Sequence, residues 1–299
     1  MRKYVHTSIF SQLPNELLDE IARCSDLREL KALCLVSKRT GDVATRRLYN
    51  TIVLENYRNA IRCFKTLIQR QYAASCVRRL AIDVLAQNLF GNFYRLAAAA
   101  LKRTTNLIGL DIANLGPLPS LLASTHFPRL MEVKIPYSPS ITSFLKTNRQ
   151  VLKAVVIDGP ASANEMLDSS KHFTDIELPE LMAFVGPCNV IPHVVPGSQV
   201  QYLTVCWEPG CERLKEIMKC VAQSRQEVLG MDNLVLGWNP GLLGVIAECV
   251  PRIERLRVRN LCPFTTQDMI EVSTIFPSAT PRSLPADLLT PFLLLFSLL

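Results

Sequence analysis

Cysteine and histidine have the most versatile chemistry in this chain, because both bind metals and both act in nucleophilic catalysis. The sequence contains ten cysteines and four histidines but no Cys-x-x-Cys pair. Its densest group, Cys188, His193, Cys206 and Cys211, lacks the spacing of a zinc site. Most cysteines lie within apolar stretches, where a reduced thiol is a small core residue. We therefore predict no metal site and no cofactor.

Catalytic loops with a known signature are also missing. The sequence has no Gly-x-x-x-x-Gly-Lys-Ser/Thr loop, no Gly-x-Ser-x-Gly elbow and no His-Glu-x-x-His. The histidines stand far apart, with no motif around any of them, at His6, His126, His172 and His193. Acid and base pairs of carboxylates assemble only in the folded chain, so the sequence leaves them open. The prediction is that this chain is not an enzyme.

Three short helices are predicted in the first fifty residues. Pro14 suits a first helical position, and Leu17, Leu18 and Ile21 lie at helical spacing. Asp26 and Glu29 have the spacing of a capping box for a second helix. That helix has its apolar stripe at Leu30, Leu33 and Cys34. The third segment, residues 37–48, directs Val43 and Leu48 inward and Lys38, Arg39, Arg46 and Arg47 outward.

Such a small helical unit often needs a partner to bury its apolar surface, or it caps the domain that follows. The strings LPNELLDEI, LRELKALCLVSKR and RRLYNTIVL resemble an F-box, which we place at residues 9–50. The resemblance implies binding to the Skp adaptor and, through it, to a cullin/RING ubiquitin ligase. It also implies a set of residues at or just behind that interface: Leu13, Pro14, Leu17, Leu18, Ile21 and Val36.

One departure from the F-box pattern concerns the third helix. Family members often carry Trp or Phe after the Lys-Arg pair, whereas here Thr40 is followed by Gly41. Glycine within a helix costs roughly 1 kcal/mol relative to alanine. We therefore expect a short or broken third helix, and the strength of adaptor docking is left open.

An apolar triplet with the spacing i, i+3, i+5 recurs after the helices, at steps of 21 to 31 residues. Steps of this size are close to those of leucine-rich repeats. The triplets are Tyr49/Ile52/Leu54, Val77/Leu80/Ile82, Leu107/Leu110/Ile112, Leu130/Val133/Ile135, Leu152/Val155/Ile157, Phe173/Ile176/Leu178, Val200/Leu203/Val205, Met231/Leu234/Leu236 and Ile253/Leu256/Val258.

Most triplets alternate as a strand does and precede a segment with helical periodicity, the clearest of which is residues 211–224. Strand and helix in alternation predict a parallel α/β solenoid with an exposed strand surface. The pattern resembles the irregular leucine-rich repeats that often follow an F-box, and we assign it to residues 51–276. An ordinary α/β domain is the alternative fold.

Polar residues between the apolar anchors are the candidates for partner recognition, although the sequence does not select among them. They include Arg78, Arg79, Asp83, Asp111, Glu132, Lys134, Gln201, Thr204, Glu254, Arg255 and Arg257. The formal charge of +7 is spread along the chain, and no aromatic-rich platform accompanies it. We expect no nucleic-acid partner.

The ends of the chain bear on its location. The N-terminus has no unbroken apolar run, which argues against a secretory signal, and the reduced cysteines favour the cytoplasm or nucleus. Residues 277–299 are rich in proline and end in an apolar run too short to span a membrane. We expect this tail to be poorly ordered, docked on the last repeat, or an artefact of the gene model, and we expect no membrane partner.

Two functional hypotheses follow. The first is a substrate-recognition adaptor of a Skp/cullin/F-box ubiquitin ligase, whose repeats bind a protein substrate of unknown identity. The second is a non-catalytic leucine-rich-repeat scaffold with no role in ubiquitin transfer, whose N-terminal helices only cap the array.

Overall fold

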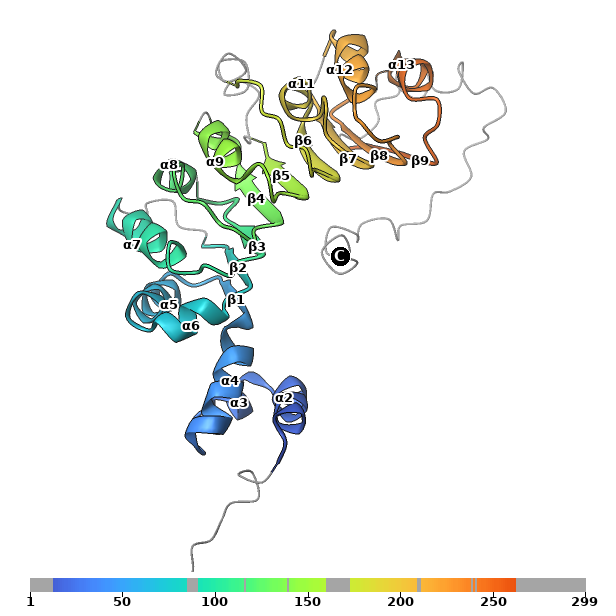
Figure 1. The fold of residues 1–299 in the computed structure, drawn as a ribbon. Coiled ribbons are helices and arrows are strands. Elements are labelled where there is room, and N and C mark those ends of the chain that lie inside the picture. Colours follow the sequence, from blue (N-terminus) through green and yellow to red (C-terminus); the bar gives the residue numbers. More distant parts are fainter. Residues whose placement is uncertain are drawn as a thin grey trace, which may run out of the picture.

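A helical unit is followed by an arc of strands and helices in the computed structural model (Figure 1). The model describes residues 13–84, 91–115, 117–138, 140–159, 173–208, 211–237, 239 and 241–261. The helical unit contains α2 (Asn15–Cys24), α3 (Leu27–Leu33) and α4 (Lys38–Asn50). Residues 277–299 and the histidines His6 and His172 lie outside the described residues.

Strands and helices alternate through the rest of the described chain. The first half contains β1 (Thr51–Leu54), α5 (Tyr57–Gln69), α6 (Gln71–Cys76), β2 (Arg79–Ile82), α7 (Gly91–Leu101), β3 (Gly109–Asp111), α8 (Leu118–Leu121), β4 (Glu132–Pro136) and α9 (Ile141–Asn148). The second half contains β5 (Ala154–Asp158), β6 (Ala183–Pro187), the 3₁₀ helix η2 (Cys188–Val190), α11 (Ile191–Val194), β7 (Tyr202–Trp207), α12 (Leu214–Val221), β8 (Gly230–Val235), α13 (Gly241–Cys249) and β9 (Arg255–Asn260).

The described strands form one parallel sheet of nine strands in the order of the sequence, β1 to β9. Each strand pairs with the next in register, so that Leu80 of β2 lies beside Ile52 of β1 and Leu110 of β3. A parallel neighbour requires a crossover, which helices provide in most repeats. The predicted α/β repeat solenoid is therefore confirmed.

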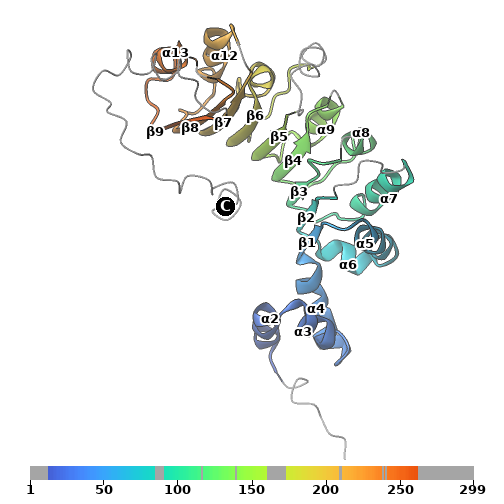
Figure 2. The same ribbon diagram turned by 180° about the vertical axis from the view of Figure 1, so that it is seen from behind.

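The helices lie on the convex side of the arc and the strands on the concave side (Figures 1 and 2). Strands pack about 4.8 Å apart, whereas helices need about 8–10 Å. The helical side of each repeat is therefore wider than the strand side. Stacking the repeats curves the array, with the strands on its inner side. No helix of the described residues lies on the concave face.

Seven of the nine predicted triplets coincide with the inward positions of strands, but the triplet Phe173/Ile176/Leu178 is wrong. These residues are buried in the segment before β6, where Leu181 and Phe184 supply the inward positions. The third inward position is Gly186, and a Cβ there would lie 2.9 Å from the Phe184 ring. The ring of Phe184 thus leaves no room for an apolar side chain at position 186.

The triplet Met231/Leu234/Leu236 is also out of register. Met231 pairs with Leu203 and Leu256, so it is the second anchor of its strand, and the third is Asn233. Asn233 is fully buried, and its Oδ1 accepts a 2.8 Å hydrogen bond from Nε1 of Trp207. An inward polar residue of this kind escapes a search for apolar anchors.

The described residues form two hydrophobic cores. The larger one runs along the inside of the solenoid from Leu54 to Val250, and the smaller one lies in the helical unit. The two parts are joined without a linker, because α4 ends at Asn50 and β1 begins at Thr51. Within the described residues, no helix is long and apolar enough to cross a membrane.

Candidate functional site

Helix α2 has two apolar faces. Leu18 and Ala22, four residues apart, are 3% and 2% exposed and pack in the small core with Leu30, Val43 and Ala44. Leu17 and Ile21 have the same spacing but are 50% and 36% exposed. One residue of a helix corresponds to about 100° of rotation. Leu17 and Leu18 therefore lie on different faces of the helix, although both lie at helical spacing with other apolar residues.

The exposed apolar residues of the helical unit extend beyond those selected from the sequence. Val36 and Pro14 are exposed and Leu13 is half-buried, in keeping with a surface role. Two further leucines were missed: Leu27 is 60% exposed, and Leu35, in the turn between α3 and α4, is 87% exposed. No pattern in the sequence marks Leu35, because it lies just outside the apolar stripe of the second helix.

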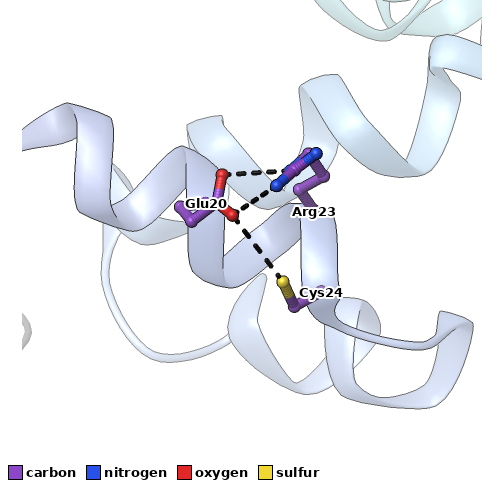
Figure 3. A network of polar contacts seen from close by, with 3 residues as sticks. All are labelled: Glu20, Arg23 and Cys24. Atoms are coloured by element: carbon purple, nitrogen blue, oxygen red, sulfur yellow. Dashed lines mark hydrogen bonds and ion pairs between the residues drawn. The ribbon is translucent and has the colours of Figure 1, made fainter.

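A small ionic network borders the exposed face of α2 (Figure 3). Arg23 donates to Glu20 through Nε at 3.0 Å and through Nη2 at 2.5 Å, and Sγ of Cys24 lies 4.0 Å from the same carboxylate. The hydrogen bond from Arg23 lowers the pKa of Glu20. The apolar residues Leu17 and Ile21 thus have a charged border on their own helix.

The start of α3 is fixed by the predicted capping box. The backbone N–H of Glu29 donates to Oδ1 of Asp26 at 2.8 Å, and the backbone N–H of Asp26 donates to Oε2 of Glu29 at 2.9 Å. Each side chain pairs with the other's backbone donor, as the sequence predicted. The helix ends at Leu33, directly before the turn that carries Leu35.

Helix α4 is neither short nor broken, which corrects the expectation drawn from Thr40 and Gly41. It runs through 13 residues, with Ser37 as its N-cap accepting from the backbone N–H of Thr40 at 3.2 Å. Thr40 is buried, and its hydroxyl lies within hydrogen-bond distance of the Ser37 hydroxyl. A Cβ on Gly41 would lie 3.0 Å from the carbonyl oxygen of Cys34. Glycine is therefore present because α4 approaches the end of α3 closely.

Helix α4 also holds α2 and the first repeat in place. Arg39 donates to the carbonyl of Leu13 at 2.6 Å and to Oδ1 of Asn15 at 2.9 Å, at the start of α2. On the other side, the hydroxyl of Tyr72 in α6 donates to the carbonyl of Asp42 at 3.1 Å. These contacts connect the helical unit to the solenoid through α4.

The second candidate site is the concave face of the sheet. Alternate residues of each strand face away from the helices. Most of the polar residues selected from the sequence lie on or beside this face: Arg79, Asp83, Asp111, Glu132, Lys134, Thr204, Arg255 and Arg257. The remaining three, Arg78, Gln201 and Glu254, precede their strands, and Arg78 donates to the Asn106 carbonyl at 3.2 Å.

Charged side chains of β2 to β5 form ion pairs with one another across the sheet. Arg79 reaches across β3 to Glu132 at 3.2 Å, and a Cβ on the intervening Gly109 would lie 3.3 Å from the Arg79 side chain. Lys134 lies 3.2 Å from Asp158 and 4.0 Å from Asp111. Burial raises the pKa of Asp111, and Lys134 opposes part of that rise. These side chains are therefore held by one another.

The group Cys188, His193, Cys206 and Cys211 does not form a metal centre. Within the described ranges, no three His, Cys, Asp or Glu residues are placed to hold a metal ion. Nδ1 of His193 instead lies 2.8 Å from Asp175. The thiols of Cys188 and Cys211 are hydrogen-bonded to each other, which lowers the pKa of Cys211 to about 7. Burial raises the pKa of Cys206 to about 11.

Three helices with exposed leucines, fixed to one end of a curved parallel solenoid, define a repeat protein with an N-terminal helical unit. Comparison with protein families identifies that unit: residues 10–50 match the family model of the F-box domain, so the chain contains an F-box. The comparison with curated proteins found no match. F-box proteins are generally non-catalytic adaptors, and the domain supports a general role in substrate recognition by Skp/cullin/F-box ubiquitin ligases.

Proposed function

We propose that this chain is the substrate-recognition adaptor of a Skp/cullin/F-box ubiquitin ligase. Its F-box docks the Skp adaptor and thereby a cullin and a RING subunit, while the solenoid binds a protein substrate. The observation that carries this proposal is the F-box match at residues 10–50. The free cysteines of the described residues suit a reducing compartment, the cytoplasm or nucleus.

The docking residues that we propose are exposed or half-buried apolar residues just before α2, in α2, at the start of α3 and in the turn before α4. They are Leu13, Pro14, Leu17, Ile21 and Val36, to which the exposure of Leu27 and Leu35 adds two more. Leu18 supports this surface from behind, because it is buried against the small core. Burying large apolar side chains is the main favourable contribution to protein association.

The adaptor contributes to catalysis by proximity. The transfer chemistry belongs to other subunits, and this chain holds the substrate near the ubiquitin carrier, so that an encounter between two molecules becomes effectively intramolecular. A fixed geometry between docking unit and substrate face is required for that effect. The direct passage from α4 into β1 and the contact of Tyr72 with Asp42 support such a geometry.

Affinity purification of the tagged full chain from its native cells, with the proteasome blocked, tests this proposal. We expect the Skp adaptor and cullin to copurify with the wild type, together with a protein that accumulates during the block. The variant Leu17→Asp/Leu35→Asp should lose the adaptor and cullin and keep its fold, because both side chains are exposed.

The same experiment separates the ligase adaptor from the scaffold. A scaffold would capture a partner whose amount does not change when the proteasome is blocked, and neither the Skp adaptor nor cullin would be present. The exposed pair Arg62→Asp/Arg95→Asp, on the helix side of the solenoid, is the control for two added acidic residues.

A further inference from the structure

The two halves of the concave face differ in charge. Along β2 to β5 the charged residues on or beside this face are two cations, Arg79 and Lys134, and four acids, Asp83, Asp111, Glu132 and Asp158. Along β7 to β9 the charged residues on or beside this face are three arginines and two acids: Arg255, Arg257, Arg259, Asp232 and Glu208. The face therefore has an acidic end near the F-box and a basic end at β9.

Two of the arginines at the basic end are available for a partner. Asp232 accepts from Arg259 at 2.6 Å, and both of these side chains are largely buried. Arg255 and Arg257 are exposed, and in the part of the chain that the structure describes neither forms an ion pair. Because they are two residues apart on one strand, their side chains leave the sheet on the same side.

An aromatic residue lies beside this pair. Tyr202 of β7, 47% exposed, belongs to the same row across the sheet as Gly230 of β8 and Arg255 of β9. A Cβ on Gly230 would lie 3.0 Å from Cδ1 of Tyr202, so the ring lies over the glycine and extends toward β9. The ring therefore gives the surface an apolar floor in the same row of the sheet as Arg255.

We propose that the surface made of Tyr202, Arg255 and Arg257 binds an extended segment of the substrate whose Asp or Glu residues alternate with neutral ones. The proposal rests on the proposed function, because it names the chemistry of the substrate at the same face. Side chains at alternate positions of an extended chain are separated by about 6.6–6.8 Å, which is also the spacing along β9. Each carboxylate thus meets one guanidinium.

Charge complementarity favours this occupant over others. Guanidinium pairs with carboxylate in a planar, bidentate geometry, which exposed arginines on one strand can offer in sequence. The acids of β2 to β5 repel the same segment at the other end of the face. The acidic segment therefore binds at the β9 end, and the rest of the substrate extends toward the F-box.

The test measures binding of a fluorescent peptide of alternating Glu and Ser residues to the full chain by fluorescence anisotropy. The reference is a peptide of the same composition with the repeat Glu-Glu-Ser-Ser, in which no two Glu residues lie two positions apart. We expect the alternating peptide to bind more tightly, and added salt to weaken it. Equal affinities for the two peptides would overturn the proposed spacing.

Variants locate the site. Arg255→Ala/Arg257→Ala should weaken the alternating peptide by about tenfold or more, since two charged hydrogen-bond partners are lost. Arg62→Ala/Arg95→Ala removes the same charge from the exposed side of α5 and α7 and should leave binding unchanged. If both pairs weaken binding equally, the effect is one of net charge and the proposed surface is wrong. Circular dichroism checks that each variant is folded.

Two further measurements separate the possible outcomes. If a peptide with phosphoserine in place of Glu binds and the Glu peptide does not, the partner is a phosphorylated segment and the assignment to carboxylates fails. The docking variant Leu17→Asp/Leu35→Asp should bind the Glu peptide normally, so that loss of the Skp adaptor is distinguishable from loss of the acidic segment. Loss of peptide binding in that variant would contradict a site on β7 to β9.

Discussion

Gly41 is unfavourable by helix propensity but favourable for the packing of α4 against the end of α3. By helix propensity it weakens the third helix of the F-box, yet α4 continues through it to Asn50. The close approach to the carbonyl oxygen of Cys34 explains the glycine: the space for a side chain is taken by backbone. Thr40 completes the local arrangement, because it is buried beside the N-cap Ser37.

Replacing Gly41 with alanine tests this explanation. We expect Gly41→Ala to lower the free energy of unfolding of the F-box by about 1 kcal/mol, because a clash with backbone outweighs the gain in helix propensity. Gly244→Ala in α13 is the matched control, since a Cβ there meets nothing within 4 Å. It should be neutral or stabilising by up to about 1 kcal/mol. Hydrogen exchange of α4 and α13 measures both, and a more protected α4 in Gly41→Ala would refute the packing argument.

We expect Cys211 to react faster near neutral pH than the more deeply buried thiols that the structure describes. Its pKa of about 7 arises first from the hydrogen bond with the Cys188 thiol and then from the backbone N–H of Arg213. The lowered pKa raises the thiolate fraction of Cys211 near neutral pH, whereas Cys63 and Cys206, with pKa values of about 11, stay protonated.

Alkylation with iodoacetamide, followed by peptide mass spectrometry between pH 6 and pH 9, gives the measurement. The rate at Cys211 should rise through pH 7 and level off, while the rate at Cys206 should still be rising at pH 9. Cys188→Ala removes the hydrogen bond, so the pKa of Cys211 should rise and its rate at pH 7 should fall. A Cys211 profile that Cys188→Ala leaves unchanged would exclude this cause.

At the scale of the elements, buried asparagines join neighbouring repeats. Asn233 of β8 accepts from the indole of Trp207 in β7 and donates to the carbonyl of Arg257 in β9 at 3.3 Å. Asn148 at the end of α9 accepts from the backbone N–H of Phe127 at 2.8 Å. Both are fully buried, and both satisfy polar groups of another repeat.

Substitution of Asn233 should therefore destabilise the solenoid beyond the loss of its volume. We expect Asn233→Ala to reduce the free energy of unfolding by about 2–3 kcal/mol, because the buried N–H of Trp207 loses its acceptor. Adding Trp207→Phe removes that donor, so the two changes together should cost less than their sum. Urea denaturation measures the cycle, with Asn59→Ala on the exposed side of α5 as the control. Strict additivity would mean that the hydrogen bond contributes nothing.

At the scale of the whole molecule, the class of fold and most of the repeats could be predicted from the sequence. Alternation of large apolar residues such as Leu80 and Ile82 reports burial directly, so most triplets coincide with strands. The two failures occurred where the inward anchor is not apolar: at Gly186, whose space Phe184 fills, and at Asn233, which is hydrogen-bonded. A search for apolar residues finds neither a glycine anchor nor an asparagine anchor.

The proposed docking surface was only partly predictable for a related reason. Helical spacing groups Leu17, Leu18 and Ile21, but only the packing of α2 on α4 decides which of them are inside. Leu35 escaped notice because an exposed leucine has no pattern of its own. The arc as a whole then sets the distance between this docking unit and the concave face, through the continuous passage from α4 to β1.

The central claim is that the F-box of this chain docks the Skp adaptor through the exposed apolar residues of α2 and of the α3–α4 turn. Calorimetric titration of the purified Skp adaptor into the full chain tests it most directly. We predict saturable binding with one adaptor per chain, its loss in the folded variant Leu17→Asp/Leu35→Asp, and normal binding by Arg62→Asp/Arg95→Asp. A folded wild-type chain that releases no heat of binding and forms no complex with the adaptor would contradict the claim.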